Sequence, residues 1–224
     1  MFDTALTMND LIFLAKGAGI TLIVTAIAVF FGTILGVIFG VFRFQVGPIW
    51  AAPLTFVLDV FRSIPLLIQL VLANAFVTTV LGWRVTGFSW NVTGFVVACG
   101  VLSLYTAAYC SEIVRGGVEA VPPNLRRAAR SLGLSWGQEM TSVTAPMAVR
   151  VALPSWIGLS LGVMKDSSLV FIIGVVELLR STQVLITRLQ EPLFLLMVCG
   201  AFYFLISFPI ARFGGYLERR WTYD

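Results

Sequence analysis

The chain has 224 residues, of which 58% are hydrophobic and 12% are charged, about half the charged fraction of a soluble domain. This composition excludes a large water-soluble domain, and the absence of histidine excludes sites that depend on imidazole. The net charge of +4 is interpreted as a signal of membrane orientation, so no nucleic-acid partner is expected. Its three cysteines follow no metal-binding or disulfide spacing, which predicts that they pack and that the chain holds no metal.

Apolar runs predict five membrane-spanning helices, because a spanning helix needs about 20 mostly apolar residues. The expected spans are about 11–42, 50–81, 91–114, 151–176 and 191–213. Together they predict an all-α integral membrane protein with one transmembrane domain over residues 1–224.

Arginine positions predict which side each loop faces. With the N-terminus outside and the C-terminus inside, most arginines lie on the cytoplasmic side, in agreement with the positive-inside bias. The expected loop at 177–191 is an exception, since its two arginines fall outside together with two glutamates.

The second predicted span carries two charges three residues apart, Asp59 and Arg62, which can share one helix face. Pro65 follows and removes a backbone hydrogen bond, so a broken helix here could expose amide groups to a substrate carboxylate. An internal Asp–Arg bridge is the alternative. Gln69 and Asn74 lie further along, either as polar lining of a pathway or as contacts between helices.

The third span ends with a second charged pair and two glycines: Glu112, Arg115, Gly116 and Gly117. One interpretation is an ion pair at a helix end, followed by a glycine stop. The other is a hinge that carries motion of the next loop into the span.

That next loop, about 115–150, is the longest cytoplasmic segment in this topology. Its residues Leu125, Ala128, Ala129 and Leu132 recur at the spacing of one helix face, and Arg126, Arg127 and Arg130 occupy the rest. Gly133 is a good terminator, and Ser135 with Gln138 has the spacing of a capping box. The pattern predicts helix, sharp turn, helix. The first helix either lies on the membrane surface or docks its small-residue face in the groove of a partner.

The fourth span contains Lys165, Asp166, Ser167 and Ser168 at a depth where charges are costly. Adjacent residues on a helix do not face each other, so each charge needs its own partner. A zwitterionic substrate offers one anion and one cation to such a site, and a structural pair that locks neighbouring helices is the alternative.

Four segments resemble the permease subunits of ATP-binding-cassette (ABC) importers. The stretch RRAARSLGLSWGQEMTSVTAPMAVRVALP (126–154) is similar to their EAA loop, although Arg127 stands at the EAA glutamate and Ala145 at the leucine of the leucine–proline pair. The segments FRSIPLLIQ (61–69), SEIVRGGVEAVP (111–122) and KDSSLVFIIGVVEL (165–178) resemble the polar amino acid uptake class, histidine/glutamate/aspartate-like, in order and spacing.

The resemblance implies a type I importer permease in a bacterial cytoplasmic (inner) membrane, with the EAA loop as a coupling helix seated on an ATPase subunit. It also implies an extracytoplasmic solute-binding protein and a second permease, identical or homologous. Residues 125–130, 132 and 133 would form the coupling interface. ATP and magnesium would be held by the ATPase, because the sequence contains no phosphate-binding G-x-x-x-x-G-K-[ST] motif.

These features predict the pore subunit of an importer that works by alternating access, with no catalytic residues and no cofactor of its own. Within the spans the carboxylates Asp59 and Asp166 each lie beside a basic residue, which favours an acidic or neutral amino acid such as glutamate or aspartate over a cationic one. The alternative function is an ion-coupled secondary transporter or a channel subunit. A membrane enzyme is disfavoured because no nucleophile–base pair is visible.

Overall fold

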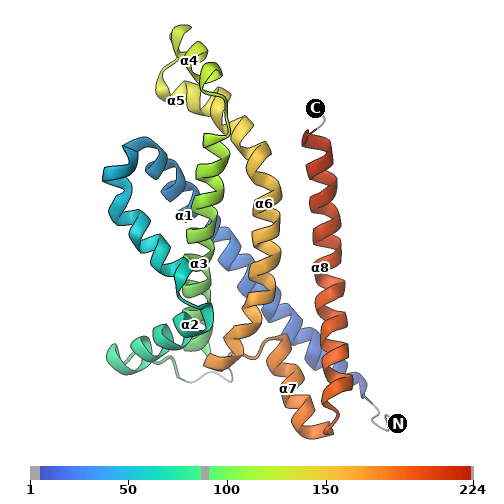
Figure 1. Cartoon of the computed structure of the whole chain (residues 1–224). Coiled ribbons are helices and arrows are strands. Elements are labelled where there is room, and N and C mark those ends of the chain that lie inside the picture. The colour runs from blue at the N-terminus through green and yellow to red at the C-terminus, as the bar shows by residue number, and fades with distance from the viewer. Residues whose placement is uncertain (1–5, 87–90, 223–224) are drawn as a thin grey trace.

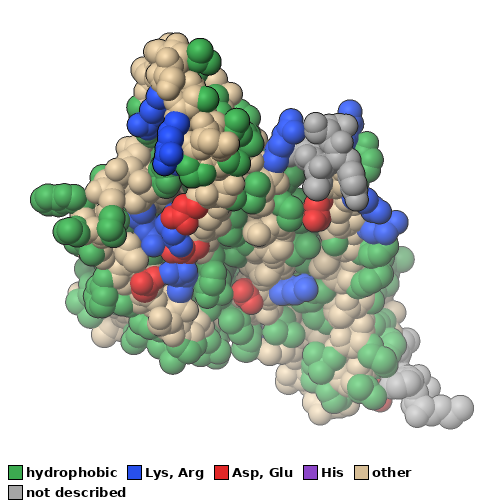
Figure 2. Space-filling view, turned by 45° about the horizontal axis from the view of Figure 1, so that its top comes forward, with side chains coloured by type: hydrophobic (Ala, Val, Ile, Leu, Met, Phe, Trp, Pro, Cys, Tyr) green, Lys and Arg blue, Asp and Glu red, His purple; other side chains and the backbone are tan. Residues whose placement is uncertain are grey.

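A computed structural model describes residues 6–86 and 91–222, and within these ranges every regular element is a helix (Figure 1). The all-α prediction is thereby confirmed for the described chain. Hydrophobic side chains spread over the face seen in Figure 2, while charged side chains gather at a few places. An apolar exterior of this kind is what a lipid environment stabilises.

The first helix, α1 (Met8–Ser63), is bent into two arms. Its 56 residues would measure about 84 Å if straight, against about 30 Å for the hydrocarbon core of a bilayer. The bend lies at Gly47, whose φ of 76° and ψ of 169° are outside the helical region, and Pro48 follows it. The second arm returns toward the end from which the first arm began (Figure 1). This bend separates the two segments predicted as the first and second spans.

The second arm ends at Ser63, and after Pro65 the chain continues as α2 (Leu66–Ala75) and a π-helical turn (Phe76–Val80). Helix α3 (Val92–Glu119) then runs back along the molecule, and its first turn is capped by Asn91, which accepts a hydrogen bond from the Gly94 amide at 2.8 Å. The glycine stop expected after Arg115 is absent, because α3 continues through both glycines for one more turn.

The loop predicted to fold as helix, turn, helix does so, as α4 (Pro123–Ser131) and α5 (Trp136–Glu139). A π-helical turn (Met140–Thr144) leads into α6 (Ala145–Asp166), which tightens into a 3-10 helix (Ser167–Ile173). The segment expected as a loop at 177–191 is mostly helix, α7 (Leu178–Leu189), and α8 (Pro192–Thr222) completes the fold.

Four helical runs in the described chain are long and apolar enough to cross a membrane: Met8–Ser63, Val92–Glu119, Trp136–Ile173 and Pro192–Arg220. The bent α1 is one of the four, so the predicted number of five spans stays a prediction. The start of α1 and the end of α8 lie toward opposite ends of the molecule (Figure 1).

The first arm of α1 packs closely against α3 through glycines spaced four residues apart at 32, 36 and 40. A Cβ atom added at Gly36 would lie 2.5 Å from Cβ of Cys110 and 3.1 Å from the Ala107 carbonyl oxygen. At Gly40 it would lie 2.8 Å from the Ser111 carbonyl oxygen. Small residues at this spacing let two helix backbones approach within a membrane. This stripe therefore sets the position of α3 against α1.

A buried carboxylate holds α7 against α1 and α8. Glu177 caps α7 by accepting hydrogen bonds from the backbone amides of Leu179 (2.8 Å) and Arg180 (2.7 Å). Its other partners are the hydroxyls of Thr21 on α1 (3.4 Å) and Tyr203 on α8 (3.3 Å). The side chain is inaccessible to solvent and lies between the third and fourth candidate spans, and this burial raises the pKa of its carboxyl.

Candidate transport pathway and coupling loop

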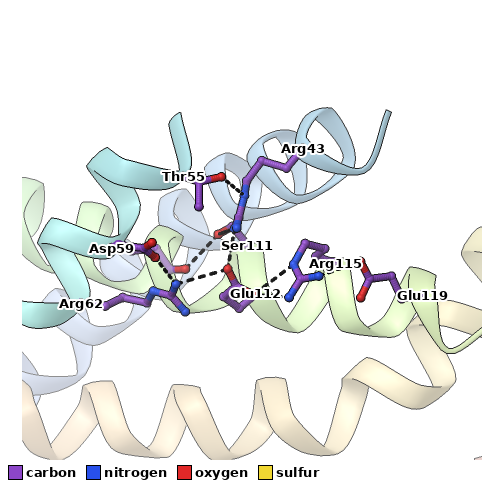
Figure 3. A network of polar contacts seen from close by, with 9 residues as sticks. Arg43, Thr55, Asp59, Arg62, Ser111, Glu112, Arg115 and Glu119 are labelled. Carbon is purple, nitrogen blue, oxygen red and sulfur yellow. Dashed lines mark hydrogen bonds and ion pairs between the residues drawn. The ribbon is translucent and has the colours of Figure 1, made fainter. Parts of the chain in front are cut away.

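A network of ion pairs joins both arms of α1 to α3 around Glu112 (Figure 3). Glu112 contacts Arg43 of the first arm at 2.6 Å, Arg62 of the second arm at 3.3 Å and Arg115 of its own helix at 2.9 Å. Arg62 also pairs with Asp59. The Arg43 side chain is 7% exposed and that of Glu112 is 22% exposed, so neither charge can rely on water alone.

The structure thus brings together two pairs that the sequence placed on separate spans. Both predicted i,i+3 ion pairs are present, Asp59 with Arg62 and Glu112 with Arg115. The sequence did not indicate that Arg43 joins them, because it lies 69 residues from Glu112 along the chain. The hinge role of this region stays a prediction.

The glycines next to this network have different surroundings. Gly117 faces α6, and a Cβ atom there would lie 2.8 Å from the Ala148 carbonyl oxygen, whereas Gly116 faces open space. Gly117 is therefore required for close contact of α3 with α6, within a helix that continues past it.

The helix break at Pro65 is closed by a side chain from the following helix. Gln69 donates from its amide nitrogen to the carbonyl oxygens of Phe61 and Ile64, both at 2.7 Å. These are carbonyls that the interruption leaves without helical partners. Gln69 is buried, and its own side-chain oxygen has no hydrogen-bond partner in the described structure. Asn74 is half-buried further along α2, and its backbone carbonyl oxygen accepts a hydrogen bond from the Thr78 hydroxyl at 2.7 Å.

The charged residues of the fourth predicted span lie where α6 tightens into the 3-10 helix. Lys165 is exposed, Asp166 and Ser168 are half-buried, and Ser167 is buried. The Ser167 hydroxyl donates to the Met164 carbonyl oxygen at 2.7 Å, which is a local structural bond. Asp166 interacts with the hydroxyl of Tyr105 on α3.

Two tyrosines on α3 lie near the two ends of this region, Tyr105 close to Asp166 and Tyr109 close to Arg62. The rings of Tyr105 and Tyr109 lie 4.8 Å apart between centroids, and the Tyr109 hydroxyl donates to the Arg62 carbonyl oxygen at 3.4 Å. Polar groups are thus spaced along α3 between Asp166 and the ion pair of Arg62 with Asp59. Sequence reasoning missed both tyrosines, although their spacing of four residues within an apolar span was a usable signal.

A cavity of about 590 Å³ opens inside the bend of α1, next to the ion-pair network. Its volume falls within the roughly 300–1,000 Å³ typical of small-molecule sites. Charged and apolar side chains both line it, namely Arg43, Phe44, Thr55, Phe56, Asp59, Arg115 and Glu119.

The geometry of the predicted coupling loop, about residues 115–150, follows from its predicted caps. Gly133 ends α4 with a φ of 86°, a left-handed conformation that favours glycine, and the Leu134 amide reaches back to the Ala129 carbonyl oxygen at 3.3 Å. Ser135 and Gln138 form the expected capping box at the start of α5. The sharp turn between the helices is therefore encoded locally.

The predicted helix face of α4 does not act as one surface. Ala129 is buried against its own chain, whereas Leu125, Ala128 and Leu132 are exposed. Arg127, Arg130 and Gly133 are also exposed, but Arg126 turns inward and its side chain is only 20% exposed. Of the residues predicted to form the coupling interface, those that are exposed and available to an outside partner are Leu125, Arg127, Ala128, Arg130, Leu132 and Gly133.

Comparison with known proteins identifies the family. The profile of the family described as "binding-protein-dependent transport system inner membrane component" matches residues 32–223. The chain belongs to this family. The resemblance found in the sequence is confirmed, and with it a multi-pass location in a bacterial inner membrane.

Curated relatives cover nearly the whole chain. It is 28% identical to YckA, a probable amino-acid ABC transporter permease of Bacillus subtilis, over 100% of this chain and 95% of that protein. It is 29% identical to the arginine transport system permease ArtQ of Bacillus subtilis (97% and 96% covered). It is equally identical to the glutamate/aspartate import permease GltK of Escherichia coli O157:H7 (98% of each). These relatives are transport components.

Solved structures show the same fold. A chain from the crystal structure of an amino acid ABC transporter with histidines superposes with a TM-score of 0.82 at 24% identity, covering 97% of this chain and 100% of that one. A chain of the MetNI methionine ABC transporter, in an inward-facing conformation, gives a TM-score of 0.75 at 20% identity, covering 95% and 99%. The type I permease architecture follows from these superpositions.

Proposed function

We propose that this chain is the pore subunit of an ATP-driven importer of a polar amino acid. The observation that carries the proposal is the series of polar groups spaced along α3 from Asp166 to the ion pairs of the bent helix, within a fold whose relatives are amino acid permeases. Alternating access would expose this series to one side of the membrane and then to the other.

Charge balance along the series favours an acidic or neutral amino acid. It contains equal numbers of cations (Arg43, Arg62, Arg115, Lys165) and carboxylates (Asp59, Glu112, Glu119, Asp166), so it has no excess negative charge for a cationic side chain. Lys165 is exposed and would meet the side-chain carboxylate of an acidic substrate, while Asp166 would meet the α-ammonium group.

Uptake by the reconstituted transporter tests the substrate assignment. The chain is placed in proteoliposomes with its ATPase, its second permease and its binding protein, and uptake of labelled glutamate, glutamine and arginine is measured. Lys165→Gln should raise the KM for glutamate more than that for glutamine, and Asp166→Asn should impair both. Uptake of arginine alone by the unchanged transporter would refute the assignment.

The exposed part of α4 would seat on the ATPase, with the N-terminus of the chain outside and the C-terminus inside. Arg127 and Arg130 are exposed, and Glu139, the acidic residue between residues 120 and 150, is fully buried. The loop therefore presents cations around apolar side chains, which fits an ATPase groove with acidic walls.

Cross-linking tests this docking. A cysteine at Leu125 in native membranes should capture the ATPase, and labelling from the outside should not reach it. Ala128→Glu should release the ATPase while leaving membrane insertion intact. Ala129 is a poorer probe, because it is buried within the loop. Labelling of the Leu125 cysteine from the exterior would refute both docking and orientation.

A further inference from the structure

Arg126 contacts helix α1, whereas the next arginine, Arg127, is exposed. Its guanidinium carbon lies 4.6 Å from the centre of the Phe44 ring, a cation–π contact. Phe44 belongs to the first arm of α1, three residues before the bend at Gly47. One arginine of α4 thus reaches across to the bend, while Arg127 points outward.

A buried carboxylate holds Arg126 in this position. Glu139 is fully buried, and its oxygens lie 3.5 Å from Nε of Arg126 and 3.7 Å from Nη2 of Arg130. Its other contact is a hydrogen bond donated by the Thr144 hydroxyl. A buried carboxylate is strongly disfavoured without a paired cation, so Glu139 fixes where the Arg126 side chain must lie.

The pair is joined by charge alone. The 3.5 Å contact joins Arg126 Nε to Glu139 Oε1, and Nε is buried without a hydrogen-bond partner in the described chain. The other carboxylate oxygen, Oε2, is also buried without one and lies nearest Arg130. Unsatisfied buried atoms are uncommon in folded proteins.

Phe44 lies at a joint between three helices. It packs on a buried apolar cluster formed by Val118 at the end of α3, Val121 just beyond it and Ala148 at the start of α6. The preceding residue, Arg43, is the α1 member of the ion-pair network around Glu112. A displacement of Phe44 would therefore be transmitted both to the bend of α1 at Gly47 and, through Arg43, to the ion pairs around Glu112.

We propose that Arg126 and Glu139 are positioning residues that tie the coupling loop to α1, so that displacement of α4 passes through Phe44 to the bend at Gly47. This inference rests on the proposed function, because it assumes that the ATPase moves α4. It gives Arg126 a role different from docking, which the exposed Arg127 fulfils.

The test measures amino acid uptake per ATP hydrolysed by the complete transporter in proteoliposomes. Arg126→Gln and Phe44→Leu should each lower this ratio at least about 5-fold, the lower end of common coupling between sites. The ATPase should still copurify with both variants. Arg126→Lys keeps a cation over the ring and should retain most of the ratio. The matched control Arg127→Gln removes the same charge from the same helix, and should weaken ATPase binding without changing the ratio.

Two results would overturn the inference. An unchanged ratio in both Arg126→Gln and Phe44→Leu would show that motion does not pass through this contact. Loss of the ATPase from the Arg126→Gln complex, to the same extent as from Arg127→Gln, would assign Arg126 to docking. If the unchanged chain recruited no ATPase, the proposed function itself would fail. If the unchanged transporter and both variants showed the same uptake per ATP hydrolysed, only this inference would fail.

Discussion

Replacing Gly36 by alanine tests how closely α1 approaches α3. The added Cβ would lie 2.5 Å from Cβ of Cys110, whereas carbon atoms in contact lie about 3.5–4.0 Å apart, so the helices would have to separate locally by about 1 Å. Overpacking of this kind costs about 1–3 kcal/mol. Against it, alanine is favoured over glycine inside a helix by about 0.5–1 kcal/mol.

The matched control is Gly19→Ala on the same helix, where the new Cβ meets nothing within 4 Å. Both variants gain the same helix propensity, so the difference between them isolates the cost of the clash, expected at about 1–3 kcal/mol. The measurement is the free energy of unfolding of the purified protein in mixed micelles titrated with a denaturing detergent. In the background Cys110→Gly, which removes the nearest atoms, the cost at Gly36 should fall. Equal stability of Gly36→Ala and Gly19→Ala would refute the packing.

Three further substitutions test the network, the helix break and the turn. Glu112→Gln removes the carboxylate shared by three arginines and should lower the free energy of unfolding by on the order of 2–3 kcal/mol. The control Glu119→Gln changes a half-exposed ion pair and should cost less than about 1 kcal/mol. Equal costs would contradict a network centred on Glu112. Gln69→Leu leaves two carbonyl oxygens at the helix break without partners and should cost at least about 1–3 kcal/mol by the same measurement; an unaffected protein would show that water replaces the side chain. Gly133→Ala forces alanine into a left-handed backbone conformation, at a cost of about 1–2 kcal/mol, and should weaken copurification of the ATPase. The control Gly137→Ala in α5 should leave copurification unchanged. Identical copurification of the two variants would show that the turn at Gly133 does not position the docking surface.

Local features of this fold were predictable because their causes lie within a few residues. The turn after α4 needs only Gly133 and the capping box that follows it, and both are visible in the sequence. The ion pair of Glu112 with Arg115 likewise needs only the helix period. The span boundary near residue 47 followed from the short interval between two apolar runs.

Features that join distant segments were not predictable from the same patterns. Arg43 reads as a loop arginine that marks the cytoplasmic side, yet it is nearly buried at the centre of the network because α1 folds back on itself. Arg180 and Arg188 suggested a charged loop, but Glu177 and its hydrogen bonds with α1 and α8 make that segment a packed helix. In each case a tertiary contact decides the outcome, and a single sequence contains no direct signal of the partner.

Glu139 shows how far such a contact changes a functional interpretation. From the sequence, all three arginines of α4 were assigned to the interface with the ATPase, and Arg127 alone was singled out, as the residue at the EAA glutamate. The structure divides them, because one fully buried carboxylate draws Arg126 inward, lies 3.7 Å from Arg130 and leaves Arg127 directed outward. A loop that must both bind a partner and transmit its motion needs two kinds of contact. Separating them on adjacent residues allows binding strength and transmission to be altered independently, and the paired variants at positions 126 and 127 measure this directly.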